Sequence, residues 1–217
     1  MKIIKDSVKT FILAVLAGIS IGIGGCAYLL CESKLVGAFV FPIGITLVVM
    51  FGMCLYTGMI GYLFENKPLY ILKLALAFAG NFAGTWIAAE LLGFTRIGDR
   101  LRTVAQGVVS VKSEDGFLSL MILGVFCGLL VFTGVDIFKK NSDKKDCVSI
   151  IALFVCIATF IIAGFEHCVA DMFYYVAAGQ LKDGIMPILS VALGNSLGGL
   201  LIPVCRMAVD KLSKSNG

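Results

Sequence analysis

Four residues of this sequence have side chains that could handle a small charged solute. His167, the single histidine, follows Glu166 within an apolar region, and Thr57 lies 110 positions earlier in another one. An imidazole exchanges protons near neutral pH, and a threonine hydroxyl can donate a hydrogen bond to an anion. Lys112 precedes a further apolar run and carries a charge that attracts anions. These residue types together could form a site for a small solute.

Each of these residues also has a purely structural interpretation. A histidine or threonine inside a membrane can hydrogen-bond a neighbouring helix or its own backbone. A lysine next to an apolar run can extend its side chain toward water, and for Lys112 the residues alone favour this interpretation. We expect Glu166 to be structural, because the N-terminus of a half-helix offers unpaired N–H groups to a carboxylate.

The composition places these residues in a lipid bilayer. Of the 217 residues, 59% are hydrophobic and 15% are charged, and the mean hydropathy is +0.99. Soluble domains are about 45–50% apolar and about 25% charged, so lipid must cover part of this chain. The apolar runs are too many and too long for a signal peptide, and we expect six spans. The uncharged runs cover residues 10–31, 35–64, 74–89, 116–135, 147–165, 172–181 and 184–205.

Two of the apolar regions predict broken helices. A single helix over residues 35–64 would be about 45 Å long, whereas the hydrocarbon core is about 30 Å thick. A break is expected near residues 55–58, which read Leu-Tyr-Thr-Gly. Residues 147–181 are interrupted in the same way at Glu166, His167 and Asp171. Irregular backbone is tolerated inside a membrane where it lines a cavity, so both breaks favour a solute site.

The two halves of the chain resemble each other. Residues 80–84 read GNFAG and residues 194–199 read GNSLGG, which puts Asn81 and Asn195 114 positions apart. That offset is close to the 110 positions between Thr57 and His167. Three spans that repeat after an odd number of crossings must be inverted. The sequence therefore predicts one transmembrane domain over 1–217, with inverted repeats at about 8–95 and 115–212 and a solute site near the bilayer midplane.

The distribution of lysine and arginine predicts the orientation. With the N-terminus inside, the inner segments hold two thirds of the 18 Lys and Arg residues, Lys2, Lys144 and Lys145 among them. Both termini are therefore expected in the cytoplasm, with the chain in the inner (plasma) membrane. Residues 95–115 carry apolar positions at helical spacing and predict an amphipathic segment at the outer surface.

Several other classes of function are disfavoured. The basic residues are scattered, so nucleic acid is not an expected partner. The eight cysteines form no CxxC pair, and we expect neither a metal nor another cofactor. An intramembrane enzyme using His167 and Cys168 is an alternative, although neighbours on one helix make a poor base–nucleophile pair. A neutral-solute channel of the aquaporin kind is a second alternative, but paired NPA motifs are absent from the sequence. A membrane assembly protein without a pore would leave the paired breaks unexplained.

The motifs resemble those of a known family. Residues 164–173, GFEHCVADMF, strongly resemble the GFEHxxxxMF signature of the formate/nitrite transporter family. Residues 34–37 followed by 55–57 resemble the second span of that family with its break, and both GNxxG segments also fit. The resemblance extends from about residue 8 to residue 212.

The resemblance implies an all-α, aquaporin-like fold of six spans, assembled as a homopentamer with a pore in each protomer. The chain would be a channel and not an enzyme, carrying formate, nitrite or hydrosulfide across the membrane with proton linkage through its central histidine. His167 would be that histidine, Thr57 the threonine on the broken second span, and Lys112 the lysine that draws anions into the outer vestibule. Asn81 and Asn195 would support the breaks. The hydrophobic constrictions would fall at Phe41, Ile45, Leu55, Val131 and Phe160.

The sequence departs from the family pattern at three positions. Gly128 stands where the family commonly has an asparagine near the histidine, Asp171 stands where asparagine is frequent, and Tyr56 replaces a frequent phenylalanine. Gly128 is expected to make the pocket roomier and less polar, which suits a soft anion such as hydrosulfide. Formate remains the first candidate because it is the broadest substrate of the family.

Overall fold

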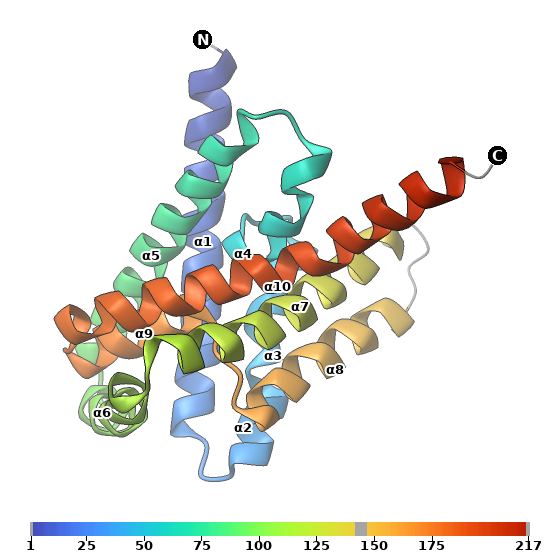
Figure 1. The fold of residues 1–217 in the computed structure, drawn as a ribbon. Helices are drawn as coiled ribbons and strands as arrows, with labels where there is room; N and C mark the ends of the chain where they lie inside the picture. The colour runs from blue at the N-terminus through green and yellow to red at the C-terminus, as the bar shows by residue number, and fades with distance from the viewer. Residues whose placement is uncertain (1, 142–146, 216–217) are drawn as a thin grey trace.

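Four long apolar helices form the framework of the computed structural model, which describes residues 2–141 and 147–215 (Figure 1). Each of the four has the length and apolar composition needed to cross a bilayer. Within these described ranges the regular structure is entirely helical. The four helices are α1 (Lys2–Leu30), α5 (Tyr70–Gly93), α7 (Phe117–Asn141) and α10 (Leu181–Ser215).

The two predicted breaks are present. Helix α8 (Cys147–Ala163) and helix α9 (Cys168–Ala178) make one bent pair, with 54° between their axes. The break begins at Gly164, whose φ of 76° suits a residue without a Cβ atom.

The other broken crossing contains four short helices. Helix α2 (Lys34–Val40) gives way to α3 (Pro42–Met50) at Pro42, which has no N–H to continue the hydrogen-bond ladder. After an extended stretch, α4 (Tyr56–Met59) and η1 (Ile60–Glu65) complete the segment. Taken as one crossing, these pieces give the six that the sequence predicts.

The predicted amphipathic segment is helix α6 (Gly98–Glu114). Its buried positions Leu101, Ala105 and Val109 recur every four residues and so lie on one helix face. That face packs against α9, so protein covers it, whereas the sequence suggested a segment lying on the membrane surface. The position matters because α6 carries Lys112 to the break between α8 and α9.

Glycines bring two pairs of long helices into backbone contact. Helix α1 lies along α5, and α7 lies along α10 (Figure 1). A Cβ atom added at Gly84 would overlap the carbonyl oxygen of Val15, and one added at Gly198 would overlap that of Val125. The two contacts occupy equivalent places in the halves of the chain, because both glycines end a GNxxG motif. Small residues at helix crossings of this kind permit close packing in membranes.

The chain begins and ends on the side of the molecule opposite α6 (Figure 1). An even number of crossings requires this arrangement, so it agrees with six spans. Lys144 and Lys145, two of the residues behind the predicted orientation, lie outside the described residues.

Candidate functional site

Asn81 holds the first break in place. Its side-chain oxygen accepts a hydrogen bond from the backbone N–H of Tyr56, the first residue of α4, at 2.9 Å. Its amide nitrogen donates to the carbonyl oxygens of Ala14 and Cys54, at 2.8 and 2.9 Å. A helix that starts inside a membrane has N–H groups that water cannot satisfy, and the buried Asn81 satisfies one of them.

Asn195 does the same at the second break. Its side-chain oxygen accepts from the N–H of Cys168, the first residue of α9, at 2.9 Å. Its amide nitrogen donates to the carbonyl oxygens of Gly124 and Glu166, both at 2.8 Å. The six bonds match one for one between the halves, which is consistent with the predicted repeat. Both asparagines therefore act as caps of half-helices.

These caps correct one detail of the expected repeat. Since Tyr56 and Cys168 occupy equivalent positions, the equivalent of His167 is Leu55 and not Thr57. Leu55 and His167 are the N-cap residues of α4 and α9, with similar extended backbone angles. Thr57 and His167 are thus non-equivalent residues that meet across the approximate symmetry.

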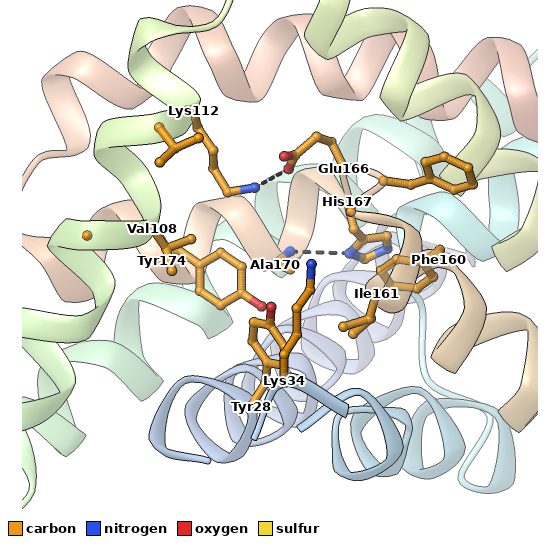
Figure 2. A pocket seen from close by; sticks show the side chains of 14 residues that line it. Tyr28, Lys34, Val108, Lys112, Phe160, Ile161, Glu166, His167, Ala170 and Tyr174 are labelled. Carbon is orange, nitrogen blue, oxygen red and sulfur yellow. Dashed lines mark hydrogen bonds and ion pairs between the residues drawn. The ribbon is translucent and has the colours of Figure 1, made fainter. Parts of the chain in front are cut away.

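Thr57 and His167 form the polar centre of the molecule. The Thr57 hydroxyl lies 2.9 Å from Nε2 of His167, and the two residues are 0% and 2% exposed. The other ring nitrogen, Nδ1, accepts the backbone N–H of Ala170 at 3.2 Å (Figure 2). A nitrogen that accepts an N–H cannot carry a proton of its own. The neutral tautomer that satisfies both contacts carries its proton on Nε2 and donates it to Thr57.

One cavity approaches this centre from the α6 side, and we name it the His167 cavity (Figure 2). It has a volume of about 370 Å³. Its polar lining comes from Lys34 on α2, Lys112 on α6, Glu166 and His167 in the break, and the aromatic residues Tyr28 and Tyr174. The sequence predicted His167 and Lys112 here but missed Lys34, Tyr28 and Tyr174, because no local pattern marks a residue that faces a cavity.

A second cavity is lined by the other break, and we name it the Leu55 cavity. It has a volume of about 220 Å³ and is lined by Leu55, Val48, Val135 and other mainly apolar residues, with Lys139 as its charged member. Leu55 and His167, the two equivalent N-cap residues, thus each line one cavity.

Buried apolar side chains lie beside both cavities. Phe41 lies between α2 and α3, and Ile45 and Val48 follow it at helical spacing on α3. The Phe41 ring packs against Phe160, a residue of the His167 cavity, at 5.9 Å between centroids, while Val48 lines the Leu55 cavity. Ile45, fully buried, lies between Phe41 and Val48 in the chain. The five residues predicted as constrictions are all buried, at 3% exposure or less: Phe41, Ile45, Leu55, Val131 and Phe160.

Lys112 makes two ion pairs with carboxylates. Its ammonium contacts Glu166, and it lies 3.0 Å from the Asp171 carboxylate (Figure 2 shows the first pair). The expectation that the Glu166 carboxylate accepts backbone amides is wrong. In the described part of the chain, the first amides of α9 are satisfied by Asn195 and by the ring of His167.

A comparison of the sequence with known protein families supports the family that the signature residues suggest. Residues 1–208 match the formate/nitrite transporter family. The chain belongs to this family. It is 24% identical to the formate channel FocB of Escherichia coli, over 96% of this chain and 89% of that protein. It is 31% identical to the formate channel BtFdhC of Bacillus thuringiensis, over 76% and 69% of the two chains.

The fold is that of solved members of the formate/nitrite transporter family. A pentameric formate channel with formate bound superposes with a TM-score of 0.78 at 24% identity, over 96% of this chain and 98% of that one. An ion channel of the same family gives a TM-score of 0.77 at 22% identity. The chain is thus an integral membrane protein with the all-helical family fold.

The glycine at position 128, a departure from the formate/nitrite transporter pattern, has a packing role. A Cβ atom at Gly128 would overlap the backbone oxygen of Asn195, and one at Gly18 would overlap that of Asn81. Gly128 therefore lies at a helix crossing and lines neither cavity. The expectation that it enlarges the pocket, and with it the argument for hydrosulfide, is wrong.

The enzyme alternative has no matching geometry. Both ring nitrogens of His167 are engaged, by Thr57 and by the amide of Ala170. Cys168 is fully buried and absent from the lining of the His167 cavity. Relatives of the chain in the formate/nitrite transporter family are named as channels, which agrees with a non-enzymatic protein.

Proposed function

We propose that this protein is a channel for small monovalent anions of weak acids, with formate as the first candidate. Nitrite and hydrosulfide belong to the same chemical class. One observation carries the proposal: a buried histidine–threonine hydrogen bond lies where two half-helices meet, next to a cavity that contains a lysine. Family membership supports it, and the named relatives are formate channels.

The apolar barrier that we propose between the two cavities, formed by the constriction residues, favours a neutral solute. A bare anion entering such a region loses its hydration at a cost of several kcal/mol or more. Low polarity raises the proton affinity of the anion itself, so the conjugate acid crosses more readily. Transport is then linked to protons and rises at acid pH.

His167 and Thr57 are proposed to hold the solute at the midpoint. The Ala170 amide fixes the ring by bonding Nδ1, so Nε2 presents its N–H at one place. An arriving solute competes with Thr57 for that N–H, and the freed threonine hydroxyl offers a second hydrogen bond. The pair thereby shares a proton with the solute without exposing an unsatisfied polar group.

The remaining expectations of the sequence fit this function and stay part of the proposal. Lys112 draws anions into the His167 cavity, and the five buried constriction residues limit passage to small solutes. The protomers form a homopentamer, supported by the solved relative described as pentameric. Both cavities are formed within one chain, so each protomer has its own path. The α6 side faces outward, which puts both termini in the cytoplasm.

The test is formate uptake into liposomes that hold the purified protein, at acidic and alkaline pH. His167→Asn and Thr57→Val should each reduce uptake and change its pH dependence, because both remove a donor from the central pair. Thr46→Val is the matched control, since the one side-chain bond of Thr46 to the described residues is to its own helix backbone at Pro42. The proposal would be refuted if the wild type showed no formate flux, or if both central variants kept the wild-type flux and pH dependence. Flux of glycerol without pH dependence would favour a neutral-solute channel.

A further inference from the structure

Lys112, in the His167 cavity, is surrounded by more negative than positive charge. Lys112 contacts Glu166 and lies 3.0 Å from Asp171, so one ammonium faces two carboxylates. With both carboxylates ionised, the three side chains carry a net charge of −1. Their side-chain exposures are 12% for Lys112, 11% for Glu166 and 2% for Asp171. A net negative group of this kind opposes the attraction of an anion that Lys112 would otherwise provide.

Asp171 is the unusual member of this group. It lies in the first turn of α9, 3.0 Å from the Lys112 ammonium, and it does not line the His167 cavity. Its Oδ2 atom has no hydrogen-bond partner among the described residues. A carboxylate buried with an unsatisfied oxygen is costly when it is charged, and taking up a proton removes the excess charge.

The other groups near Asp171 do not cancel its charge. Lys34 is the other cation of the cavity, but it is exposed to solvent and enters from the wall opposite Lys112 (Figure 2). His167 is held as a neutral donor by the Ala170 amide. The other groups that interact with Asp171 are thiols and phenols, which are uncharged when protonated: Cys127 on α7, and Cys168, Tyr174 and Tyr175 on α9. Tyr28 on α1, which lines the same cavity, is also a phenol.

We propose that Asp171 is a proton-binding residue that sets how much of the Lys112 charge an anion meets in the His167 cavity. The proposal rests on the anion-channel function above. With Asp171 ionised, the group Lys112–Glu166–Asp171 has a charge of −1 and disfavours the anion. With Asp171 protonated, the group is neutral and the ammonium of Lys112 attracts the anion. Asp171 touches no solute, and it acts through Lys112 by changing the net charge that the anion meets.

The test compares Asp171→Asn with wild type in formate uptake over a pH series. The quantity compared is the uptake rate of Asp171→Asn divided by that of the wild type at the same pH. Protonation of formate in solution is the same in both samples and cancels in this ratio. The ratio should be near 1 at acid pH and rise to about 10-fold at alkaline pH, as expected for one unit charge roughly 10 Å away at an effective dielectric constant of about 20. Asp183→Asn is the matched control, because Asp183 is an exposed carboxylate at the start of α10 and its loss should leave the ratio flat.

A second measurement reads the proton directly. In infrared difference spectra over the pH series, the protonated carboxyl band of the wild-type protein should contain a component that persists in Asp183→Asn and is lost in Asp171→Asn. A ratio that does not change with pH, or a carboxyl titration in Asp171→Asn that is identical to that of the wild type, would overturn the proposal. Absence of formate flux from the wild type at every pH would instead refute the channel function, and the infrared titration would still decide whether Asp171 binds a proton.

Discussion

Replacing Asn195 with aspartate removes the two hydrogen bonds that its side-chain nitrogen donates. The aspartate has nearly the same shape and can still accept the N–H of Cys168. It cannot donate to the carbonyl oxygens of Gly124 and Glu166, which are bonded at 2.8 Å in the native protein. Both acceptors then lose a partner, and a buried carboxylate faces them.

The expected loss of stability follows from those two bonds. Each buried partner left unsatisfied costs about 1–3 kcal/mol, so Asn195→Asp should lose roughly 2–6 kcal/mol. The control is Asn66→Asp, because the side chain of Asn66 donates an exposed bond to the carbonyl of Tyr62. Its removal should cost at most about 1 kcal/mol.

The assay is denaturant unfolding in detergent, combined with amide hydrogen exchange. In Asn195→Asp, exchange should accelerate most in peptides that cover the break between α8 and α9, and much less in the break before α4, which Asn81 holds. A loss of stability no larger than that of Asn66→Asp would refute the reasoning that Asn195 fixes this break. Uniformly faster exchange over the whole chain would show that the effect is not local to the cap.

Two further substitutions test the packing around the site. Gly128→Ala should lower the free energy of unfolding by about 1–3 kcal/mol, because the added Cβ atom would meet the Asn195 backbone. Gly107→Ala, with open space around it, should be neutral or slightly stabilising in the same unfolding measurement. Phe160→Ala removes the ring that stacks on His167 at 5.8 Å and packs against Phe41. It should raise uptake of larger monocarboxylates relative to formate in liposomes, and the exposed Phe64→Ala should not; an unchanged solute preference would argue against Phe160 as part of the constriction.

The membrane class and the order of the helices follow from the sequence alone. Apolar runs of about 20 residues must be spanning helices because backbone polar groups in lipid have to be satisfied within the segment. Both breaks were also predictable, one from the excess length of residues 35–64 and the other from polar residues at 166, 167 and 171. The family follows from the signature at residues 164–173 and the two GNxxG motifs.

Only the tertiary structure decided what the polar residues contact. The sequence treated Thr57 and His167 as equivalents, whereas the caps Asn81 and Asn195 shift the register by two residues and make them partners instead. Side chains from α6 and α9 meet because helix packing brings together positions that are far apart in the chain, and no local pattern encodes such a distance. For this reason the pairing of Lys112 with Glu166 and Asp171 was not predicted and emerged from the fold.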